Sequence, residues 1–198
     1  LFGNSDQPYY SDDKNIALIF NGEFYNFSQY KNSLIEKKIN FKTEGDTEVL
    51  LKLYETIGIN FLRDKKIDSL YSIAIHDKKL DKIFISRDWP GRIPLYYYYE
   101  KGRFIFSSEL KAFRAISNLS LQDPIELEPG KIIEYDIKKD ELSVISNYNL
   151  QPYISKNNND ILKLGKEMHQ LLDKSAKNRT MGDVPICTML SGGIDSVL

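Results

Sequence analysis

The stretch that decides the fold lies at the end of the chain and reads Val184-Pro-Ile-Cys-Thr-Met-Leu-Ser-Gly-Gly-Ile-Asp-Ser-Val-Leu198. Its first half is an apolar run of strand length, broken only by Pro185 and Thr188, and two glycines, an acid and a serine follow where a helix should begin. In such a turn backbone N–H groups converge on an anion, and the helix N-terminus adds a partial positive charge. The stretch therefore predicts a buried strand, a phosphate-binding turn and the start of a helix. A Gly-rich turn with a capping serine is the structural alternative.

Two common phosphate loops are excluded by this sequence. A Walker A loop needs a Lys before its Ser or Thr, and the Rossmann spacing of glycines, G-x-G-x-x-G, is absent as well. The remaining pattern, Ser-Gly-Gly-x-Asp-Ser at residues 191–196, resembles the pyrophosphate loop of ATP pyrophosphatases. That resemblance implies an enzyme that splits ATP into AMP and pyrophosphate to activate a carboxylate or a similar group.

A second strand-like run, near the start of the chain, also ends in a polar motif. Residues 16–20 are continuously apolar and short enough for a strand buried on both faces, and Asn-Gly-Glu-Phe-Tyr-Asn follows at 21–26. Four more motifs come later in the chain: Thr-Glu-Gly-Asp-Thr-Glu-Val at 43–49, Ser-Arg-Asp at 86–88, Pro-Leu-Tyr-Tyr at 94–97 and Ser-Ser-Glu-Leu-Lys-Ala at 107–112. In this order, and ending in the 191–196 loop, the set resembles glutamine-dependent asparagine synthetase and its close relatives, over essentially the whole chain.

The family resemblance implies two domains. Members join a class II glutamine amidotransferase domain to an ATP-pyrophosphatase synthetase domain. We therefore expect an α+β fold in which residues 1–150 form a four-layer αββα sandwich of the N-terminal-nucleophile-hydrolase type. Residues 151–198 would begin an α/β ATP-pyrophosphatase domain, with the polar stretch 151–160 as the linker. Because the chain starts with Leu1 and stops about one turn into its last helix, we expect a fragment that lacks both ends.

Local patterns predict helices and hairpins that agree with this fold. A first helix should follow Asn26, whose spacing to Gln29 resembles a helix-start box, and a second should run to Gly58. A third helix, capped by Asp160, has the apolar face Ile161, Leu164, Met168, Leu171 and Leu172. Hairpins are predicted from 70–76 with 82–87, 95–99 with 103–107, and 132–137 with 142–145.

Composition excludes several function classes. The 27 Lys and Arg residues nearly balance the 28 Asp and Glu residues, so no net field draws the chain to nucleic acid or to a membrane. A single Cys excludes an internal disulfide and is typical of a reducing compartment. No stretch is long and apolar enough to span a bilayer, and the chain does not start like a signal peptide. We expect a soluble, cytoplasmic protein whose partners are small molecules; a homodimer stays open.

The resemblance assigns glutaminase roles to four residues. Hydrolysis of a carboxamide needs a nucleophile, a base and donors for the developing oxyanion. In the family the nucleophile is an N-terminal Cys with its own α-amino group as base, and an Arg before the position of Leu1 grips the substrate carboxylate. Asn21 and Gly22 would form the oxyanion hole, and both would bind glutamine together with Glu23 and Asp46, whose carboxylates would hold its ammonium. Because the Cys and the Arg are missing, the fragment alone should be inactive.

These positions also have structural alternatives. Asn-Gly is a common turn dipeptide, and Asp46 could simply cap the second helix. Arg87 and Asp88 could form an ion pair with each other at a strand end. Cys187 lies inside the apolar run before the loop, so we expect it to be buried and inert.

At the second site the resemblance implies ATP and Mg²⁺. The contacts to ATP or pyrophosphate would come from six residues of the loop: Leu190, Ser191, Gly192, Gly193, Asp195 and Ser196. Asp195 would also be the Mg²⁺ ligand, because Mg²⁺ prefers carboxylate and phosphate oxygens. In the family, aspartate reacts with ATP to give an aspartyl-adenylate, and ammonia released from glutamine displaces AMP to form asparagine. Glutamine, aspartate and ATP are therefore the expected substrates.

Three functions are compatible with these motifs. The first is a glutamine-hydrolysing asparagine synthetase. The second is a related amidotransferase, or a β-lactam-synthetase-like ligase with another acceptor, because Trp89-Pro90 stands where many relatives have an Arg-Phe pair. The third is a non-catalytic glutamine-binding module, against which the acid in the phosphate loop argues. ATP–pyrophosphate exchange would distinguish the third from the other two.

Overall fold

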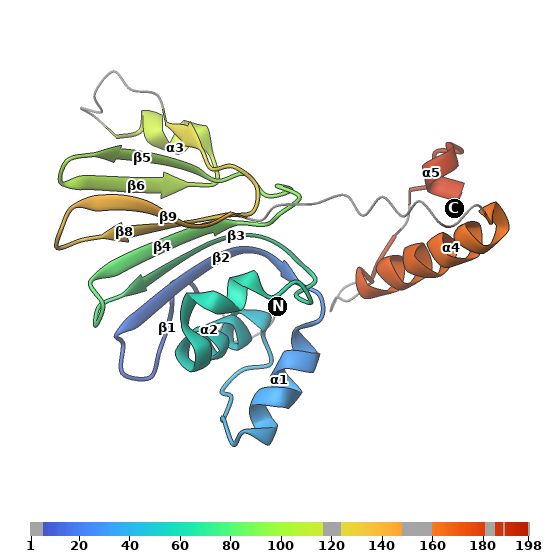
Figure 1. Cartoon of the computed structure of the whole chain (residues 1–198), viewed down its shortest axis with the longest axis horizontal. Coiled ribbons are helices and arrows are strands. Elements are labelled where there is room, and N and C mark those ends of the chain that lie inside the picture. The colour runs from blue at the N-terminus through green and yellow to red at the C-terminus, as the bar shows by residue number, and fades with distance from the viewer. Residues whose placement is uncertain (1–5, 117–123, 148–159, 181–184, 188, 198) are drawn as a thin grey trace. The chain divides into compact units, whose positions relative to one another are not determined.

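The computed structural model describes residues 6–116, 124–147, 160–180, 185–187 and 189–197 (Figure 1). The contacts between residues in space divide the chain into two compact units, Phe2–Gln151 and Pro152–Leu198. Most of the stretch predicted to be a linker, 151–160, lies outside the described residues, so the domain boundary at residue 150 stays a prediction. None of the described helices is long and apolar enough to cross a membrane.

Two antiparallel sheets form the larger unit. The six-stranded sheet has the order β1-β2-β3-β4-β8-β9 (Figure 1), with these bounds: β1 Tyr9–Tyr10, β2 Ile16–Phe24, β3 Ser69–Asp77, β4 Lys82–Arg87, β8 Lys131–Asp136 and β9 Glu141–Asn147. The three-stranded sheet has the order β6-β5-β7, with bounds β5 Tyr96–Glu100, β6 Arg103–Ser107 and β7 Ile125–Glu126. All three predicted hairpins are confirmed, because β3 pairs with β4, β5 with β6 and β8 with β9.

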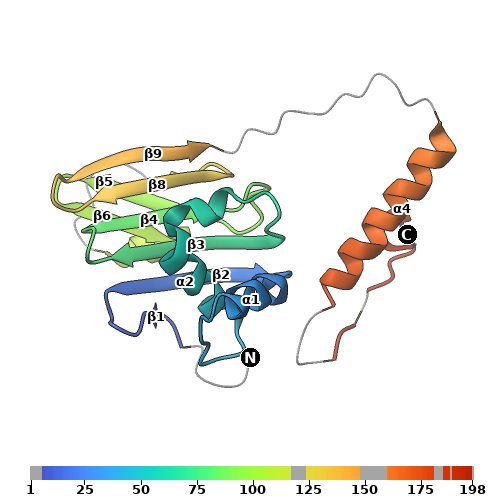
Figure 2. The same ribbon diagram turned by 60° about the horizontal axis from the view of Figure 1, so that its bottom comes forward.

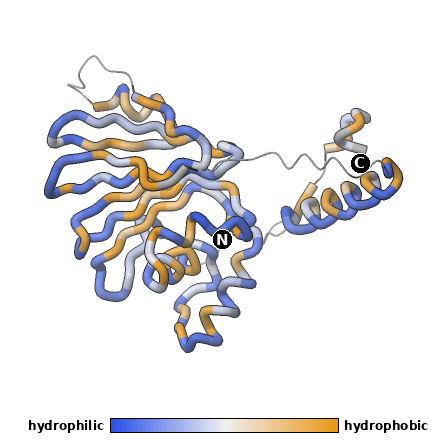
Figure 3. The backbone as a smooth tube through the Cα atoms, viewed as in Figure 1, coloured by the Kyte–Doolittle hydropathy of each residue, from blue (hydrophilic) through white to orange (hydrophobic). Residues whose placement is uncertain are grey.

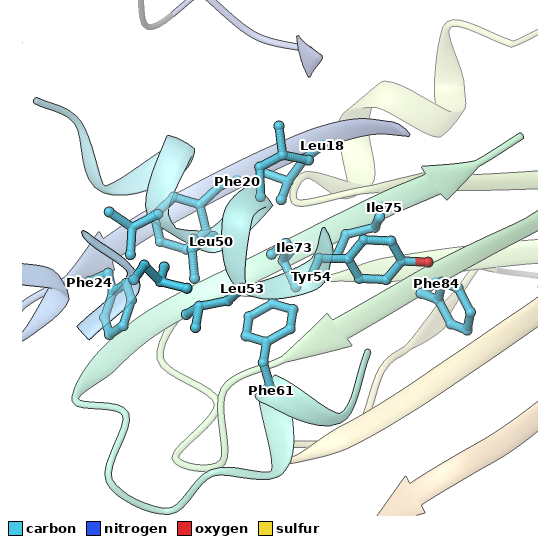
Figure 4. Close-up of a cluster of buried hydrophobic side chains, with 13 residues drawn as sticks. Leu18, Phe20, Phe24, Leu50, Leu53, Tyr54, Phe61, Ile73, Ile75 and Phe84 are labelled. Carbon is cyan, nitrogen blue, oxygen red and sulfur yellow. The ribbon is translucent and has the colours of Figure 1, made fainter. Parts of the chain in front are cut away.

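Helices cover one face of the six-stranded sheet. Figure 2 shows α1 (Phe27–Glu36) and α2 (Asp46–Ile57) in front of that face, and the 3₁₀ helix η1 (Gly58–Arg63) continues α2. Leu50, Leu53 and Tyr54 of α2 project onto β2 and β3 in the buried cluster drawn in Figure 4. The predicted end of this helix is confirmed, since Gly58 has a φ of 64°, which a glycine adopts without strain.

The opposite face of the six-stranded sheet packs on the three-stranded sheet. Ala74, Ile85 and Ile133 of the larger sheet share a buried cluster with Leu95 and Leu127, which flank β5 and β7. The short helix α3 (Leu110–Arg114) follows β6 and contacts it. Helices, sheet and sheet therefore form three successive layers of an αββα sandwich, and the predicted α+β fold class is confirmed.

Two local predictions in this unit are wrong. The run 16–20 is not buried on both faces: Leu18 is fully buried on the helix side, whereas Ile19 on the other side is 38% exposed, because that side opens into a cavity. Asn26 does not form a helix-start box. Its carboxamide donates to the carbonyl of Lys66 and accepts from the N–H of Asp68, so it ties the start of α1 to a distant loop and makes no capping bond.

The smaller unit contains α4 (Ile161–Asn178) and α5 (Ile194–Val197). Asp160 caps α4 as predicted, because its side chain accepts from the N–H of Lys163 at 3.1 Å. Figure 3 shows apolar and polar residues alternating along α4. The apolar face predicted to be a core face is exposed, with Ile161, for example, 82% exposed.

The strand and the buried cysteine predicted before the loop are not found. Residues 185–187, 189 and 190 lie outside any strand, and Cys187 is exposed. A strand buried on both faces needs strands beside it, since its N–H and C=O groups must be paired. The described residues of this unit contain helices α4 and α5 and no partner strand.

Candidate functional site

Asn21, Gly22 and Glu23 lie toward the C-terminal end of β2, paired with β3, and not in a turn. Gly22 is directly opposite Tyr71, and Asn21 and Glu23 flank it on the other face of the sheet. A Cβ atom at position 22 would lie 2.0 Å from the carbonyl oxygen of Leu70, so no side chain fits there. The alternative that Asn-Gly is a turn dipeptide is therefore wrong, and the glycine is required by the close approach of the two strands.

Asp46 joins the start of α2 to the end of β2. It is the first residue of the helix, and Gly45 occupies the cap position, so the alternative that Asp46 is the cap is also wrong. Its carboxylate accepts from the N–H of Phe24 at 3.1 Å and from the hydroxyl of Thr47 at 3.4 Å. We call the set Asn21, Gly22, Glu23 and Asp46 the β2–α2 corner.

The two acids of the β2–α2 corner have raised pKa values. Partial burial raises the pKa of Glu23, and the negative charge of Asp46 raises it further. Burial also raises the pKa of Asp46, although backbone hydrogen bonds from Phe24 and Thr47 oppose that shift. Neither acid takes part in an ion pair recorded for the described residues. Two neighbouring carboxylates attract a cationic group such as an ammonium.

A buried acid of α2 fixes the loop that leads into Asp46. Glu48 is 2% exposed, and its carboxylate accepts from the backbone N–H groups of Lys42 and Thr43 and from the Thr43 hydroxyl. These bonds set the position of residues 42 and 43 and with them the entry of the chain into α2. The motif at 43–49 contained this acid, but nothing in the sequence separated its role from that of Asp46.

A cavity of about 270 Å³ lies beside Asn21, between the two sheets. Gln7 lines it and pairs through its carboxamide with the backbone of Phe20, accepting from the N–H at 2.7 Å and donating to the carbonyl at 2.9 Å. On the other side, Asn21 Nδ2 donates to Ser108 Oγ at 3.1 Å. Sequence reasoning missed Gln7 and Ser108 as site residues, and the only signal was that Ser108 belongs to the motif at 107–112.

Arg87 and Asp88 pair with other residues and not with each other, which corrects the prediction made from their adjacency. The Arg87 guanidinium contacts Glu126 at 2.7 Å and also donates to backbone carbonyls, including those of Gly91 and Leu127. Asp88 is fully buried, and its ion pair is with Arg92 at 3.5 Å. Arg87 is the last residue of β4 and Asp88 begins the loop that follows, and the side chain of each finds its partner elsewhere.

The second candidate site, the 191–196 loop, has the predicted turn. Gly192 has a φ of 76°, and α5 begins at Ile194. The Ser191 hydroxyl donates to that of Ser196 at 3.1 Å, and the Ser196 hydroxyl donates to the Gly193 carbonyl at 2.9 Å. Leu190 is 73% exposed beside the loop. The side chain of Asp195, the predicted Mg²⁺ ligand, lies outside the described residues. Its role as a ligand therefore stays a prediction.

No metal centre is built by the protein alone in the described part of the chain, where no group of three or more His, Cys, Asp or Glu residues could hold an ion. Mg²⁺ beside a nucleotide is generally bound through one or two carboxylates, water and the substrate phosphates. The open turn at Gly192, where an added Cβ would meet nothing within 4 Å, leaves room for such phosphates.

Comparison with known families identifies the larger unit. Residues 1–149 match the model of the glutamine amidotransferase domain, and residues 167–198 match that of asparagine synthase. The chain belongs to the glutamine amidotransferase domain family. Within this family setting, Asn21, Gly22, Glu23 and Asp46 form a cluster at one end of the β2–β3 pair.

The names of curated relatives of this glutamine amidotransferase domain protein contain the same two terms as the two family models, glutamine and asparagine. It is 31% identical to asparagine synthetase [glutamine-hydrolyzing] 2 of Bacillus subtilis, over 98% of this chain and 30% of that protein. It is 32% identical to asparagine synthetase B [glutamine-hydrolyzing] of Escherichia coli, over 96% of this chain and 32% of that protein. The chain thus spans about a third of the length of these relatives.

Solved structures agree on the fold. Glutamine phosphoribosylpyrophosphate amidotransferase of B. subtilis, in complex with ADP and GMP, superposes with a TM-score of 0.58 at 23% identity, covering 73% of this chain and 32% of that one. A structure described as the allosteric regulatory enzyme of purine biosynthesis gives a TM-score of 0.59 at the same identity. The fold of the larger unit therefore recurs in both of these structures.

Proposed function

We propose that this chain belongs to a glutamine-hydrolysing asparagine synthetase. Residues 1–150 are its glutaminase domain, and residues 151–198 begin the domain that activates aspartate with ATP. The observation that carries the proposal is the β2–α2 corner, where an amide donor and a glycine backbone stand beside two neighbouring carboxylates. An ammonium-binding acid pair next to an oxyanion-stabilising pair suits free glutamine, which has a cationic amine at one end and a carboxamide at the other.

Each group of the corner has one task in glutamine hydrolysis. Glu23 and Asp46 hold the α-ammonium, so that the side-chain carboxamide is directed toward Asn21 and Gly22. A thiolate from the N-terminal cysteine of the family attacks the carboxamide carbon, ammonia leaves, and water then releases glutamate from the thioester. The Nδ2 group of Asn21 and the backbone N–H of Gly22 stabilise the oxygen that becomes negative in each step.

The 191–196 loop holds the nucleotide in this proposal. Leu190 lies beside the nucleotide, and the backbone and hydroxyl groups of the loop's serines and glycines face the pyrophosphate. Asp195 binds Mg²⁺ together with the phosphates, and the ion neutralises phosphate charge. Ammonia from the first domain is then consumed at an activated aspartate, with AMP and pyrophosphate as the other products. A cytoplasmic location agrees with the use of ATP and free amino acids.

The test is a product analysis with the full-length protein. It is incubated with glutamine, aspartate, ATP and Mg²⁺, and asparagine, glutamate, AMP and pyrophosphate are quantified. Equal amounts of asparagine, AMP and pyrophosphate are expected. Glutamate without asparagine would point to another acceptor, and pyrophosphate without glutamate to a ligase that does not use glutamine. Glutamine binding with neither product would identify a non-catalytic binding module.

A matched pair of variants makes this test specific for the corner. Asp46→Asn keeps the hydrogen bond from Phe24 and removes the charge, so glutamine-dependent synthesis should require far more glutamine. Asp13→Asn removes an exposed surface carboxylate that pairs with Lys79 and should leave synthesis unchanged. Synthesis with ammonium chloride in place of glutamine should be the same in both variants and in the wild type.

A further inference from the structure

Two serine hydroxyls stand behind the carboxamide of Asn21. Asn21 and Ser72 are direct partners across β2 and β3, so their side chains share one face of the sheet. Ser108 reaches the same place from the other sheet, one residue beyond the end of β6. Its Oγ lies 3.1 Å from Asn21 Nδ2 and 3.0 Å from Ser72 Oγ, and all three side chains line the cavity.

Counting hydrogens shows what this row of groups can do. A serine hydroxyl has one hydrogen and two lone pairs, and a carboxamide has a nitrogen that only donates and an oxygen that only accepts. Ser72 is 4% exposed, so its hydroxyl depends on protein partners. The bond between the two hydroxyls can run in either direction, and in both cases a lone pair of Ser108 Oγ accepts from the amide nitrogen of Asn21. The amide nitrogen is therefore the end of the carboxamide that Ser108 binds.

The orientation of this carboxamide decides whether it can stabilise an oxyanion. One Nδ2 hydrogen is bound by Ser108, and the other stays available at the cavity. A carboxamide rotated by half a turn would instead present its oxygen to the developing negative charge, which would repel it. A donor that is already oriented before the reaction costs no reorganisation in the transition state.

We infer that Ser108, supported by Ser72, is a positioning residue for glutamine hydrolysis, which holds the Asn21 carboxamide with its nitrogen toward the oxyanion. The inference rests on the proposed function, since it concerns the same site. It adds a contribution from the second sheet, through the motif at 107–112, for which the proposed reaction gave no role. Ser108 does not touch glutamine; it acts through Asn21.

The first test is steady-state glutaminase kinetics of the full-length protein. Loss of one complete oxyanion donor reduces kcat by about 10²–10³. Ser108→Ala removes the acceptor and leaves the donor in place but free to rotate, so kcat should fall by about tenfold or more. The KM for glutamine should stay within about twofold of the wild type, because Glu23 and Asp46 still bind the ammonium. Ser108→Thr keeps a hydroxyl and should retain most of kcat.

Two further variants separate positioning from simple packing. Ser72→Ala removes the hydroxyl that is hydrogen-bonded to Ser108 Oγ, so Ser108 is held less firmly against Asn21 and a smaller fall in kcat is expected. Ser107→Ala is the matched control. It removes the neighbouring hydroxyl, which accepts from the N–H of Glu109 and has no hydrogen bond to Asn21 in the described structure. Its glutaminase kinetics should equal those of the wild type.

A double-mutant cycle completes the test. In an Asn21→Ala background, Ser108→Ala should cause no additional loss, because the group that it positions is gone. An equal loss in both backgrounds, a rise in KM without a fall in kcat, or the same loss in Ser107→Ala would overturn the inference. Ammonia-dependent asparagine formation, unchanged in every variant, reports that the protein is folded. If the wild type forms asparagine from ammonia but hydrolyses no glutamine, the proposed function itself fails. The inference about Ser108, which rests on that function, then fails with it.

Discussion

The β2–α2 corner and the 191–196 loop differ in how far along the chain their contacts reach. In the corner, Asp46 binds a backbone group 22 residues away and Asn21 binds a hydroxyl 87 residues away. In the loop, the hydrogen bonds of Ser191, Gly193 and Ser196 join residues two to five positions apart. A site made by long-range contacts depends on the packing of the whole unit, whereas a local turn depends on its own sequence. Substitutions in the corner should therefore change both the stability of the fold and glutamine hydrolysis. Substitutions of residues with only local contacts should change one of these without the other.

The largest effect is expected from Gly22→Ala. The added methyl would stand 2.0 Å from the Leu70 carbonyl oxygen, so β2 and β3 must separate at the site. Overpacking of this kind costs about 1–3 kcal/mol of unfolding free energy, and glutamine hydrolysis should be lost because Asn21 moves with the strand. Thermal unfolding and glutaminase assays of the full-length protein measure both effects.

Gly165→Ala in α4 is the matched control for Gly22→Ala. An added Cβ meets nothing within 4 Å there, and Ala is favoured over Gly inside a helix by about 1 kcal/mol. It should stabilise α4 and leave glutamine hydrolysis unchanged. Wild-type glutaminase activity in Gly22→Ala would contradict the tight strand pairing at residue 22.

The next effect in size is expected for Asp46→Asn. Loss of a charged partner for the substrate ammonium costs about 1.5–3 kcal/mol, so the KM for glutamine should rise by about ten- to a hundredfold. The unfolding free energy at neutral pH should stay the same or increase. Because the folded-state pKa of Asp46 is raised, its charge destabilises the fold above that pKa, and the amide carries no charge. Kinetics combined with thermal unfolding would show the two opposite changes; a parallel loss of stability and affinity would mean that Asp46 acts mainly in the fold.

Sequence patterns predicted local features of the molecule better than distant contacts. The hairpins, the end of α2 at Gly58 and the cap at Asp160 follow from short-range rules, and all three are confirmed. Asn26 met the local pattern of a capping residue, yet its side chain binds residues 66 and 68. Tertiary partners outcompeted the local bond, and no single-sequence rule contains them.

The candidate site shows the same division. The motif at 21–26 drew attention to Asn21, Gly22 and Glu23, but their position inside a sheet, and the clash that requires Gly22, appear only with β3 in place. The partners of Arg87 and Asp88 lie across loops and were assigned wrongly from adjacency. Ser108 could not have been connected to Asn21, because their contact joins the two sheets.

A moderate effect is expected when pH is lowered. Binding of the glutamine ammonium requires charged carboxylates, and the pKa values of Glu23 and Asp46 are both raised by burial. As pH falls from neutrality, these acids take up protons at pH values where an ordinary Asp or Glu would still be ionised. The KM for glutamine should therefore rise several-fold in that range while ammonia-dependent synthesis is unaffected. Asp46→Asn should flatten the profile, and a KM that stays constant down to the ordinary carboxyl range would show that the acids do not bind the ammonium.

The smallest effect is expected for a local contact, in Asp160→Ala. The side chain accepts one hydrogen bond, from the N–H of Lys163, and loss of such a cap costs about 1 kcal/mol. Amide hydrogen exchange over the first turn of α4 should become about fivefold faster, because local opening reports that free energy directly. Asp160→Ser keeps a capping oxygen and should restore slow exchange, while glutamine KM and kcat stay at wild-type values in both variants. A change in glutamine kinetics would contradict the separation of local from long-range contacts, since Asp160 has no partner in the corner among the described residues.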